Sequence, residues 1–162
     1  MRTLFVLLAG LLLAGSLQAQ NAARYAAFRL EARSDYNEQA TELLRTACRY
    51  ILDNPLQKDD AERLAANTYL LRWMTGSPDY TFVLDGSSSK FTKVNQQLMG
   101  PFLAALTLYA LDHPAEKADQ KKLNLGAVRG TIAYCKAQGI KLKGDAKKWA
   151  EAEEKGRLEE VL

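Results

Sequence analysis

Apolar residues recur at intervals of three and four positions along much of the chain, which is the spacing of one face of an α-helix. The clearest stripe predicts a helix over 38–53 and consists of Ala40, Leu43, Leu44, Ala47 and Ile51. The same reasoning predicts four more helices, over 61–74, 95–111, 118–136 and 145–160. A short helix over 22–32 is a further expectation. The pattern therefore predicts an all-α fold.

Prolines, glycines and acids mark where these helices begin and end. Asn54 precedes Pro55, and the residue before a proline is driven out of the helical region, so the first helix is expected to end there. Asp60 can cap the start of the second helix, and Gly76 ends it. Asp145 is expected to cap the last helix.

Two glycines lie inside the fourth predicted helix. Gly126 and Gly130 are four residues apart, so they share one helix face. Each costs about 1 kcal/mol relative to alanine in a helix interior. Their presence indicates either close packing of a neighbouring helix or a kink.

The segment 77–92 lacks the helical pattern. Residues 80–84 are of types that are common in strands, and 85–89 are small and polar, so we expect a long connector with one extended stretch. Ser87 and Lys90 fit the Ser-x-x-Lys pattern of penicillin-recognising enzymes, but the companion Ser-Asp-Asn and Lys-Thr-Gly elements are absent. A solvated serine loop is the better interpretation.

Two segments that lie 59 residues apart are similar. Residues 50–64 and 109–123 are identical at seven of fifteen positions, and upstream apolar residues also correspond, as Leu43 does to Phe102. The simplest interpretation is two helical hairpins of one design, although any helix pair joined by a proline turn shares some of these features. We expect 20–162 to be a single domain of about five helices, with two proline-turn hairpins packed as a small bundle or short helical-repeat layer.

One stretch of the sequence resembles a known protein family. From Trp73 to Phe82 the chain reads Trp-Met-Thr-Gly-Ser-Pro-Asp-Tyr-Thr-Phe. Together with the Asn54-Pro55 turn, this stretch resembles a family of exported, all-helical bacterial proteins of unknown function, and the resemblance covers most of 20–162. That family has no known catalytic residues. The resemblance therefore implies export and a helical fold, and it assigns no activity.

Residues 1–19 have the three zones of a secretory signal. Arg2 supplies a positive tip, 4–14 form an apolar run that only Gly10 relieves, and small and polar residues lead to Ala19. The run is shorter than the roughly 20 apolar residues that span a bilayer, although a buried N-terminal helix or a membrane anchor is the alternative. We predict cleavage after Ala19 and export to the periplasm or the exterior.

The same region argues against a lipid anchor. Residues 13–16 resemble a bacterial lipoprotein signal in which Ser16 replaces the lipid-bearing cysteine, so no thiol is available for acylation. The longest later apolar stretch, 98–111, is about 14 residues long and contains Gly100-Pro101. We expect a soluble exported protein with no transmembrane segment in the mature chain.

Charge and cysteine content limit the classes of partner and of cross-link. Loss of Arg2 with the signal leaves 21 basic and 19 acidic residues, and this near-neutral balance does not favour nucleic acid as a partner. Cys48 and Cys135 are a candidate disulfide, because paired cysteines are common in oxidising compartments. Two buried thiols that act as small apolar residues are the alternative.

Residues for common catalytic and metal sites are scarce. His113 is the single histidine, and its counterpart in the repeat is Asn54, so a turn or capping role is the better interpretation. One histidine and two distant cysteines do not make a zinc ligand set, and no nucleotide-binding glycine motif is present. We expect no metal, cofactor or catalytic residue.

Two groups of residues are candidates for binding. An aromatic group near the end of the second helix is either core packing or the lining of a pocket, and its members are Tyr69, Trp73, Met74 and Tyr80. Between 117 and 148, nine basic residues face two acidic ones. This excess is either a solvated surface or an anion-binding face, for which the candidates are Lys117, Lys121, Lys122, Lys141 and Lys143.

Three functions are consistent with this sequence. A non-enzymatic binding or scaffold protein of the cell envelope, with a protein partner, agrees best with the duplicated hairpin and the scarcity of catalytic residues. A binder of polyanions or lipid surfaces would use the lysine-rich region 117–148. An envelope hydrolase would have to rely on carboxylates alone.

Overall fold

A computed structural model describes residues 20–162, and the regular secondary structure of this part of the chain is entirely helical. The five long helices are α2 (Glu38–Asp53), α3 (Ala61–Gly76), α5 (Met99–Asp112), α6 (Gln120–Ala137) and α7 (Gly144–Glu154). The number of helices exceeds five because of shorter ones, which are residues 20–27, α4 (Ser87–Thr92) and α8 (Leu158–Val161). Three 3₁₀ turns complete the chain: η1 (Arg33–Asp35), η2 (Gln96–Leu98) and η3 (Pro114–Glu116). The all-α prediction is confirmed.

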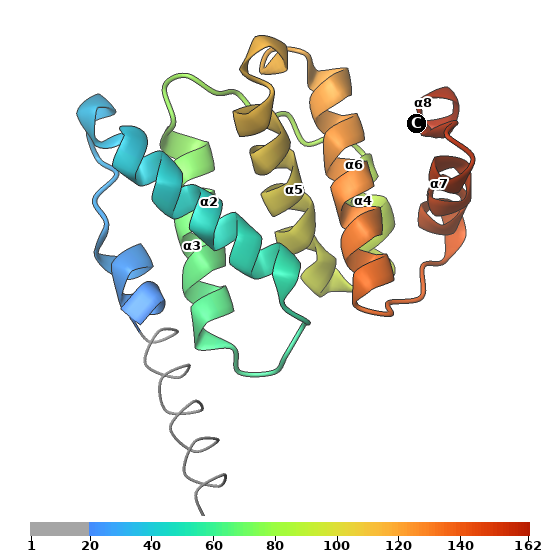
Figure 1. The fold of residues 1–162 in the computed structure, drawn as a ribbon, viewed down its shortest axis with the longest axis horizontal. Coiled ribbons are helices and arrows are strands. Elements are labelled where there is room, and N and C mark those ends of the chain that lie inside the picture. The colour runs from blue at the N-terminus through green and yellow to red at the C-terminus, as the bar shows by residue number, and fades with distance from the viewer. Residues whose placement is uncertain (1–19) are drawn as a thin grey trace, which may run out of the picture.

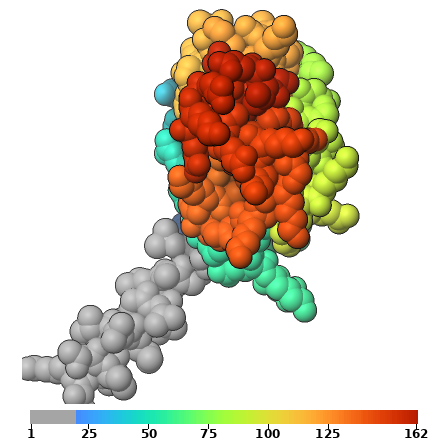
Figure 2. Space-filling view, turned by 90° about the vertical axis from the view of Figure 1, so that its right-hand side faces the viewer, coloured from blue at the N-terminus to red at the C-terminus, as the bar shows by residue number. Residues whose placement is uncertain are grey.

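The helices pack as one small bundle (Figure 1). α3, α5, α6 and α7 follow one another across the molecule, α2 crosses in front of α3, and α4 lies behind α6. α7 and α8 cover the end of the bundle opposite α2, as the space-filling view of that end shows (Figure 2). The central helix is α5, which packs against α2, α3, α4 and α6.

The two predicted hairpins are present as α2–α3 and α5–α6. α2 ends at Asp53 and α5 at Asp112, while α3 begins at Ala61 and α6 at Gln120. Both pairs of boundaries differ by 59 residues, which is the offset of the sequence repeat. The duplication therefore extends from the sequence to the positions where helices start and stop.

Equivalent residues also make equivalent contacts at the two turns. Nδ2 of Asn54 donates to the carbonyl oxygen of Tyr50 at 2.9 Å, and Nδ1 of His113 lies 3.0 Å from the carbonyl oxygen of Tyr109. In each case a side chain just beyond the helix satisfies a carbonyl of its last turn. The structure thus gives His113 the turn role that its match with Asn54 predicts.

The helix that follows each turn is capped by an aspartate. Oδ1 of Asp60 accepts a hydrogen bond from the backbone N–H of Arg63 at 2.8 Å. Oδ1 of Asp119 accepts from the backbone N–H groups of Lys121 and Lys122 at 3.1 and 3.2 Å. Each bond satisfies an N–H that has no partner within the helix, so the cap predicted at Asp60 is confirmed and recurs in the second hairpin.

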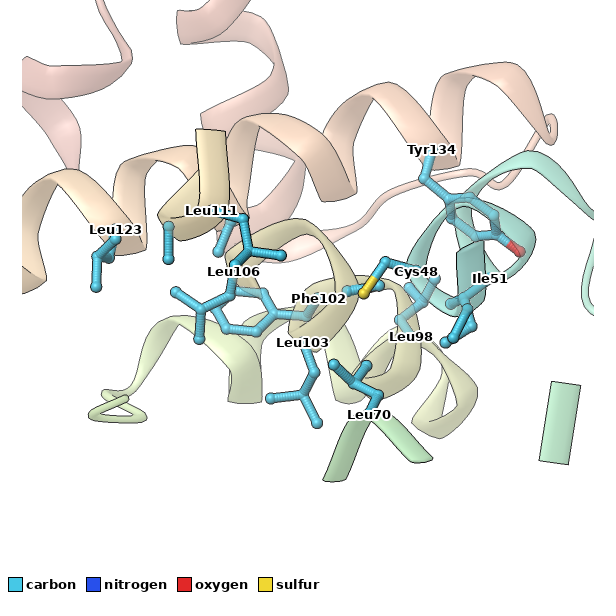
Figure 3. Packing of buried hydrophobic residues seen from close by; sticks show 14 of the residues in the cluster. Cys48, Ile51, Leu70, Leu98, Phe102, Leu103, Leu106, Leu111, Leu123 and Tyr134 are labelled. Carbon is cyan, nitrogen blue, oxygen red and sulfur yellow. The ribbon is translucent and has the colours of Figure 1, made fainter. Parts of the chain in front are cut away.

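The two hairpins share one hydrophobic core. Figure 3 shows Cys48 of α2 beside Phe102 of α5, with Leu98 next to them. All three side chains are buried, as are most apolar residues of α5. Burial of apolar area at about 25 cal/mol per Å² is the main stabilising term for such a bundle.

Polar contacts also join the hairpins. The guanidinium group of Arg45 on α2 pairs with Asp112 and donates to the carbonyl oxygen of Leu111 at 3.2 Å, both at the end of α5. The hydroxyl of Tyr134 on α6 donates to the carbonyl oxygen of Asn54 at 3.1 Å. Each contact ties one hairpin to the turn or helix end of the other.

The glycines of α6 allow close packing against α5 within an unbroken helix. A Cβ atom at Gly126 would lie 2.3 Å from the ring of Tyr109, and one at Gly130 would lie 2.6 Å from Cβ of Ala105. These distances confirm the close-packing interpretation, and α6 continues through both glycines from Gln120 to Ala137.

The C-terminal helix differs from its prediction. α7 begins at Gly144 and ends at Glu154, and the chain then turns at Gly156, which has φ +66°, before α8. The predicted cap is also wrong, because the carboxylate of Asp145 accepts a hydrogen bond from Nζ of Lys90 at 2.7 Å and caps no backbone N–H. A glycine in the left-handed region is a common helix stop.

The connector between the hairpins contains a short helix where a serine loop was expected. α4 begins at Ser87, a buried residue whose Oγ accepts a hydrogen bond from Nδ2 of Asn124 at 2.9 Å. The preceding extended stretch forms no strand. The side-chain amide of Gln120 holds it by donating to the carbonyl oxygen of Thr81 and accepting from the N–H of Val83, both at 3.1 Å.

The structure agrees only in part with the predictions for the N-terminal region. The helix predicted over 22–32 is shorter and occupies residues 20–27. The export signal predicted at 1–19 lies outside the described residues. Within 20–162 no helix has the length and apolar character needed to cross a membrane.

Candidate functional site

The predicted aromatic group is part of the core. Tyr69 and Trp73 are buried, and the Tyr69 hydroxyl donates to the carbonyl oxygen of Ala40 at 3.0 Å. The Trp73 ring contacts Tyr80 with centroids 5.3 Å apart. Met74 is half-buried and packs against the same core. The structure brings Trp73 and Tyr80 into contact, whereas Tyr69 contacts α2 and the N-terminal segment through Ala40, Tyr25 and Phe28.

The outer edge of this group carries one cation. Nζ of Lys117 lies 5.2 Å from the centroid of the half-buried Tyr80 ring, which stacks on Phe82 at an interplanar angle of 7°. A cation over an exposed ring of this kind contributes about 0.5–1 kcal/mol. Lys117 therefore has a local structural partner.

Acids outside the window 117–148 balance much of its positive charge. Nζ of Lys122 pairs with Glu116 at 2.8 Å. Other basic side chains of the window pair with acids of α7 and α8, which are Glu151, Glu153, Glu154 and Glu159. Within the described residues, the lysines of the predicted anion face that make no ion pair are Lys117, Lys121, Lys141 and Lys143. Four of the five predicted lysines thus make no ion pair, while acids beyond the window lower its net charge.

The two cysteines are free thiols buried in the core. Cys48 on α2 and Cys135 on α6 have exposed fractions of 0% and 1%. Burial raises the pKa of Cys48 and raises the pKa of Cys135 to about 11, so both stay protonated at neutral pH. The structure thus describes the alternative in which the cysteines act as small apolar residues.

A groove between α3 and the start of α5 is the strongest candidate site. We call it the α3–α5 groove; it has a volume of about 590 Å³. Its apolar lining consists of Leu56, Leu64, Leu71, Met99 and Leu103. Its polar lining includes the side-chain amides Gln57, Asn67, Gln96 and Gln97. An apolar floor with amide groups at the rim suits an apolar segment whose polar groups need partners.

Two leucines of this groove are unusually exposed. Leu64 and Leu71 are 70% and 49% exposed, and they lie seven residues apart on one face of α3. The opposite face of α3 is buried through Ala66, Leu70 and Trp73. α3 therefore has apolar residues on two faces, and the core covers one of them.

Close packing at Gly100 sets the geometry of the groove. A Cβ atom at Gly100 would lie 2.5 Å from Oδ1 of Asn67, so a side chain there would push α5 away from α3. Nδ2 of Asn67 donates to the carbonyl oxygen of Arg63 at 2.8 Å, which fixes the amide in place.

Sequence reasoning missed this groove, because it searched for clusters of aromatic and charged residues. The signal that could have revealed it is the pair Leu64 and Leu71, which repeats at seven residues outside the stripe through Ala66, Leu70 and Trp73. A second apolar stripe on a surface helix marks a face that is available to another segment.

A second groove, of about 600 Å³, lies beside the start of α6. It is lined by Val83 of the connector, by Leu162 at the C-terminus and by polar and charged residues that include Lys121, Lys122, Asp85 and Glu159. Charges of both signs face this groove. The α3–α5 groove differs from it in having two strongly exposed leucines, Leu64 and Leu71, on one face of a single helix.

The described residues contain no cluster of three or more His, Cys, Asp and Glu side chains placed to hold a metal ion. In the Ser-x-x-Lys segment the amine of Lys90 forms an ion pair with Asp145, so it is directed away from Ser87. Asp60, which lines the α3–α5 groove, accepts hydrogen bonds from Tyr50 and Arg63.

Comparison with known proteins adds no identification. No family model matches the chain, and neither a curated protein nor a solved structure matches it. The resemblance to exported helical proteins stays a prediction from the sequence. The arguments for function therefore rest on this chain's own surface.

Proposed function

We propose that this protein is an exported, non-enzymatic binding module of the cell envelope, and that the α3–α5 groove holds an apolar segment of a partner protein. The observation that carries the proposal is the exposure of Leu64 and Leu71 side by side on α3. The predicted signal at 1–19 supports the location outside the cytoplasm.

The shape of the groove favours an amphipathic helix as the occupant. Leu64 and Leu71 are two helical turns apart, which is about 10 Å along α3. An amphipathic helix presents apolar residues at the same spacing and lies in such grooves with its polar face in solvent. Gln96 and Gln97 at the rim can bond to its exposed polar groups.

Site-specific photo-crosslinking in cells tests the proposal. A photoreactive residue at position 71 is expected to capture a partner protein, and the added substitution Leu64→Ser is expected to lower the yield at least tenfold. A photoreactive residue at Leu84, which is 51% exposed and lines neither groove, is the matched control. Equal yields at positions 71 and 84, or a yield that Leu64→Ser leaves unchanged, would contradict the proposed groove.

The stability of the groove variants can be checked separately. Because Leu64 is 70% exposed, Leu64→Ser is expected to change the free energy of unfolding by about 0.5 kcal/mol or less. Loss of crosslinking in a folded variant therefore reports on binding. Crosslinking that weakens steeply with added salt would instead favour the polyanion-binding alternative.

A further inference from the structure

Glu62 is a buried carboxyl group for which the described residues supply no good partner. It lies in the first turn of α3, and its exposed fraction is 4%. Neither carboxylate oxygen has a hydrogen-bond partner of normal geometry. Burial of a carboxylate without a cation or hydrogen bonds costs several kcal/mol, so this arrangement needs a further group.

The N-terminal segment is what lies over Glu62. Residues 20–27 are helical and continue along α3, where the Tyr25 ring contacts Tyr69 with centroids 5.9 Å apart. Further along, Nη2 of Arg72 donates to the carbonyl oxygen of Phe28 at 2.9 Å. These contacts place the beginning of the segment at the beginning of α3.

The groups around Glu62 do not neutralise it. Burial raises its pKa most strongly, the side-chain amide of Asn21 favours the charged form, and the nearby carboxylate of Asp60 disfavours it. Arg63, the next residue, directs its guanidinium to Asp60 and to backbone carbonyls of the first turn. Among residues 20–162, no cation lies within ion-pair distance of Glu62.

The second hairpin shows that this burial is not a requirement of the repeat. The position equivalent to Glu62 is Lys121, which is exposed. In the first hairpin the N-terminal segment packs on α3 through Tyr25 and Phe28, and its Asn21 side chain lies beside Glu62. An acid at the contact indicates that the segment brings a positive charge.

We propose that the α-ammonium group created at Gln20 by removal of the export signal is the counter-ion of Glu62, so that processing completes a buried ion pair and fixes the mature N-terminus on α3. Hydrolysis of the bond between Ala19 and Gln20 consumes one water, leaves a carboxylate on Ala19 and leaves an amine on Gln20. That amine is protonated at neutral pH, because the usual pKa of an α-amino group is about 7.7–8.0. Gln20 is the neighbour of Asn21, whose amide already faces Glu62.

This inference rests on the proposed export and cleavage, and a thermodynamic cycle tests it on chains of defined start. Four proteins are compared, and all of them begin at Gln20. The α-amino group is either free or acetylated, and each of these two forms is made with Glu62 and with Glu62→Gln. Intact mass confirms each N-terminus and excludes cyclised Gln20. Acetylation is expected to lower the urea midpoint by roughly 0.5 M or more with Glu62 and by much less with Glu62→Gln.

The pH dependence gives a second readout. Pairing raises the pKa of the ammonium in the folded state, so its contribution is complete near and somewhat below about pH 7.7 and is lost as pH rises through the folded pKa. At acid pH the pair is lost as well, once Glu62, whose pKa burial raises, is protonated. The titratable groups that face Glu62 are Tyr25, Tyr50 and Asp60, and both tyrosines have pKa values raised to about 12, so they stay neutral over this range. The effect of acetylation is expected to disappear by about pH 10.

Two results would overturn the inference. One is an equal effect of acetylation on the protein with Glu62 and on the protein with Glu62→Gln. That result would contradict the ion pair and would leave the proposed export and binding unaffected. The other is a mature chain, isolated from the producing cells, whose mass shows a start other than Gln20. Retention of residues 1–19 in that chain would also contradict the proposed export.

Discussion

Arg63 shows how one side chain can stabilise a turn between helices. Its guanidinium donates to the carbonyl oxygens of Ile51 at 3.0 Å, Asn54 at 2.6 Å and Pro55 at 3.1 Å. These carbonyls lie at and beyond the end of α2, where no helical N–H can reach them. A single buried cation thus serves three acceptors of the turn, and the carbonyl oxygen of Asn54 has the Tyr134 hydroxyl as a second donor.

Removal of this group is expected to be costly. Arg63→Met retains much of the side-chain volume and is predicted to lower the free energy of unfolding by about 2–4 kcal/mol, because the carbonyl oxygens of Ile51 and Pro55 lose this donor and Asp60 loses its cation. Urea denaturation followed by circular dichroism measures the change. Arg49→Met, at an exposed position of α2, is the matched control and is expected to change stability by about 0.5 kcal/mol or less.

Burial of the two thiols leads to a second prediction at the residue scale. Since burial raises the pKa of Cys135 to about 11 and raises that of Cys48 as well, neither thiolate is available in the folded protein at pH 8. A thiol reagent such as iodoacetamide is expected to modify neither cysteine in the native protein and both after unfolding without a reductant. An unfolded protein that stays unmodified until a reductant is added would establish the disulfide instead.

At the scale of elements, contact between α5 and α6 depends on two glycines. A Cβ at Gly126 would lie 2.3 Å from the Tyr109 ring, a distance that real Cβ contacts do not reach, so the helices must move apart. The loss of packing between α5 and α6 opposes the gain of about 1 kcal/mol in helix propensity that alanine provides. The packing term is the larger of the two, because overpacking typically costs 1–3 kcal/mol and here displaces a ring.

Gly126→Ala is therefore predicted to destabilise the protein by about 1–2 kcal/mol in spite of its better helix propensity. Gly86→Ala is the matched control, because Gly86 has φ −66° and a Cβ there would meet no atom within 4 Å. The control is expected to be neutral or slightly stabilising. Thermal unfolding of both variants gives the comparison, and a more stable Gly126→Ala would show that α5 and α6 are less tightly packed than described.

The elements that the sequence predicted well are those defined by local chemistry. The boundaries at Asn54-Pro55 and Asp60 follow from proline sterics and capping, which act within a few residues. The helix α4 was missed because its stability comes from burial of Ser87 and from Asn124, a distant partner. The end of α7 was misplaced because the left-handed turn at Gly156 was not anticipated.

The candidate site was less predictable than the fold. Which apolar stripe of α3 faces the core depends on how α5 packs, and the sequence alone does not show this. The net charge of the region 117–148 depends on packing as well, because Lys136 and Arg129 have acidic partners in Glu154 and Glu153 on α7. Charge and exposure are properties of the assembled surface, whereas helix boundaries are properties of short segments.

At the scale of the whole molecule, the shared core makes the two hairpins one folding unit. Trp73 belongs to the first hairpin and Trp149 to α7, and both are buried. They are the only tryptophans of the chain, so each can report on one end of the bundle. A single cooperative transition is expected for a domain of this size.

Variants with one tryptophan each test this cooperativity. In Trp149→Phe the fluorescence of Trp73, and in Trp73→Phe that of Trp149, is predicted to change at the same urea concentration as the circular dichroism of the same variant. Coincidence in both variants is the two-state result. Separate midpoints in either variant would mean that one end of the bundle unfolds independently.

The burial of two free thiols also sets a time limit on folding in an oxidising compartment. Cys48 and Cys135 are protected only when the hairpins share their core, and until then each is a reactive thiol of ordinary pKa. Disulfide chemistry takes seconds to hours, whereas helical domains dominated by local contacts fold in microseconds to milliseconds. The contacts between the hairpins that bury both thiols are thus expected to form before either thiol is oxidised, because folding of the bundle is faster than disulfide formation.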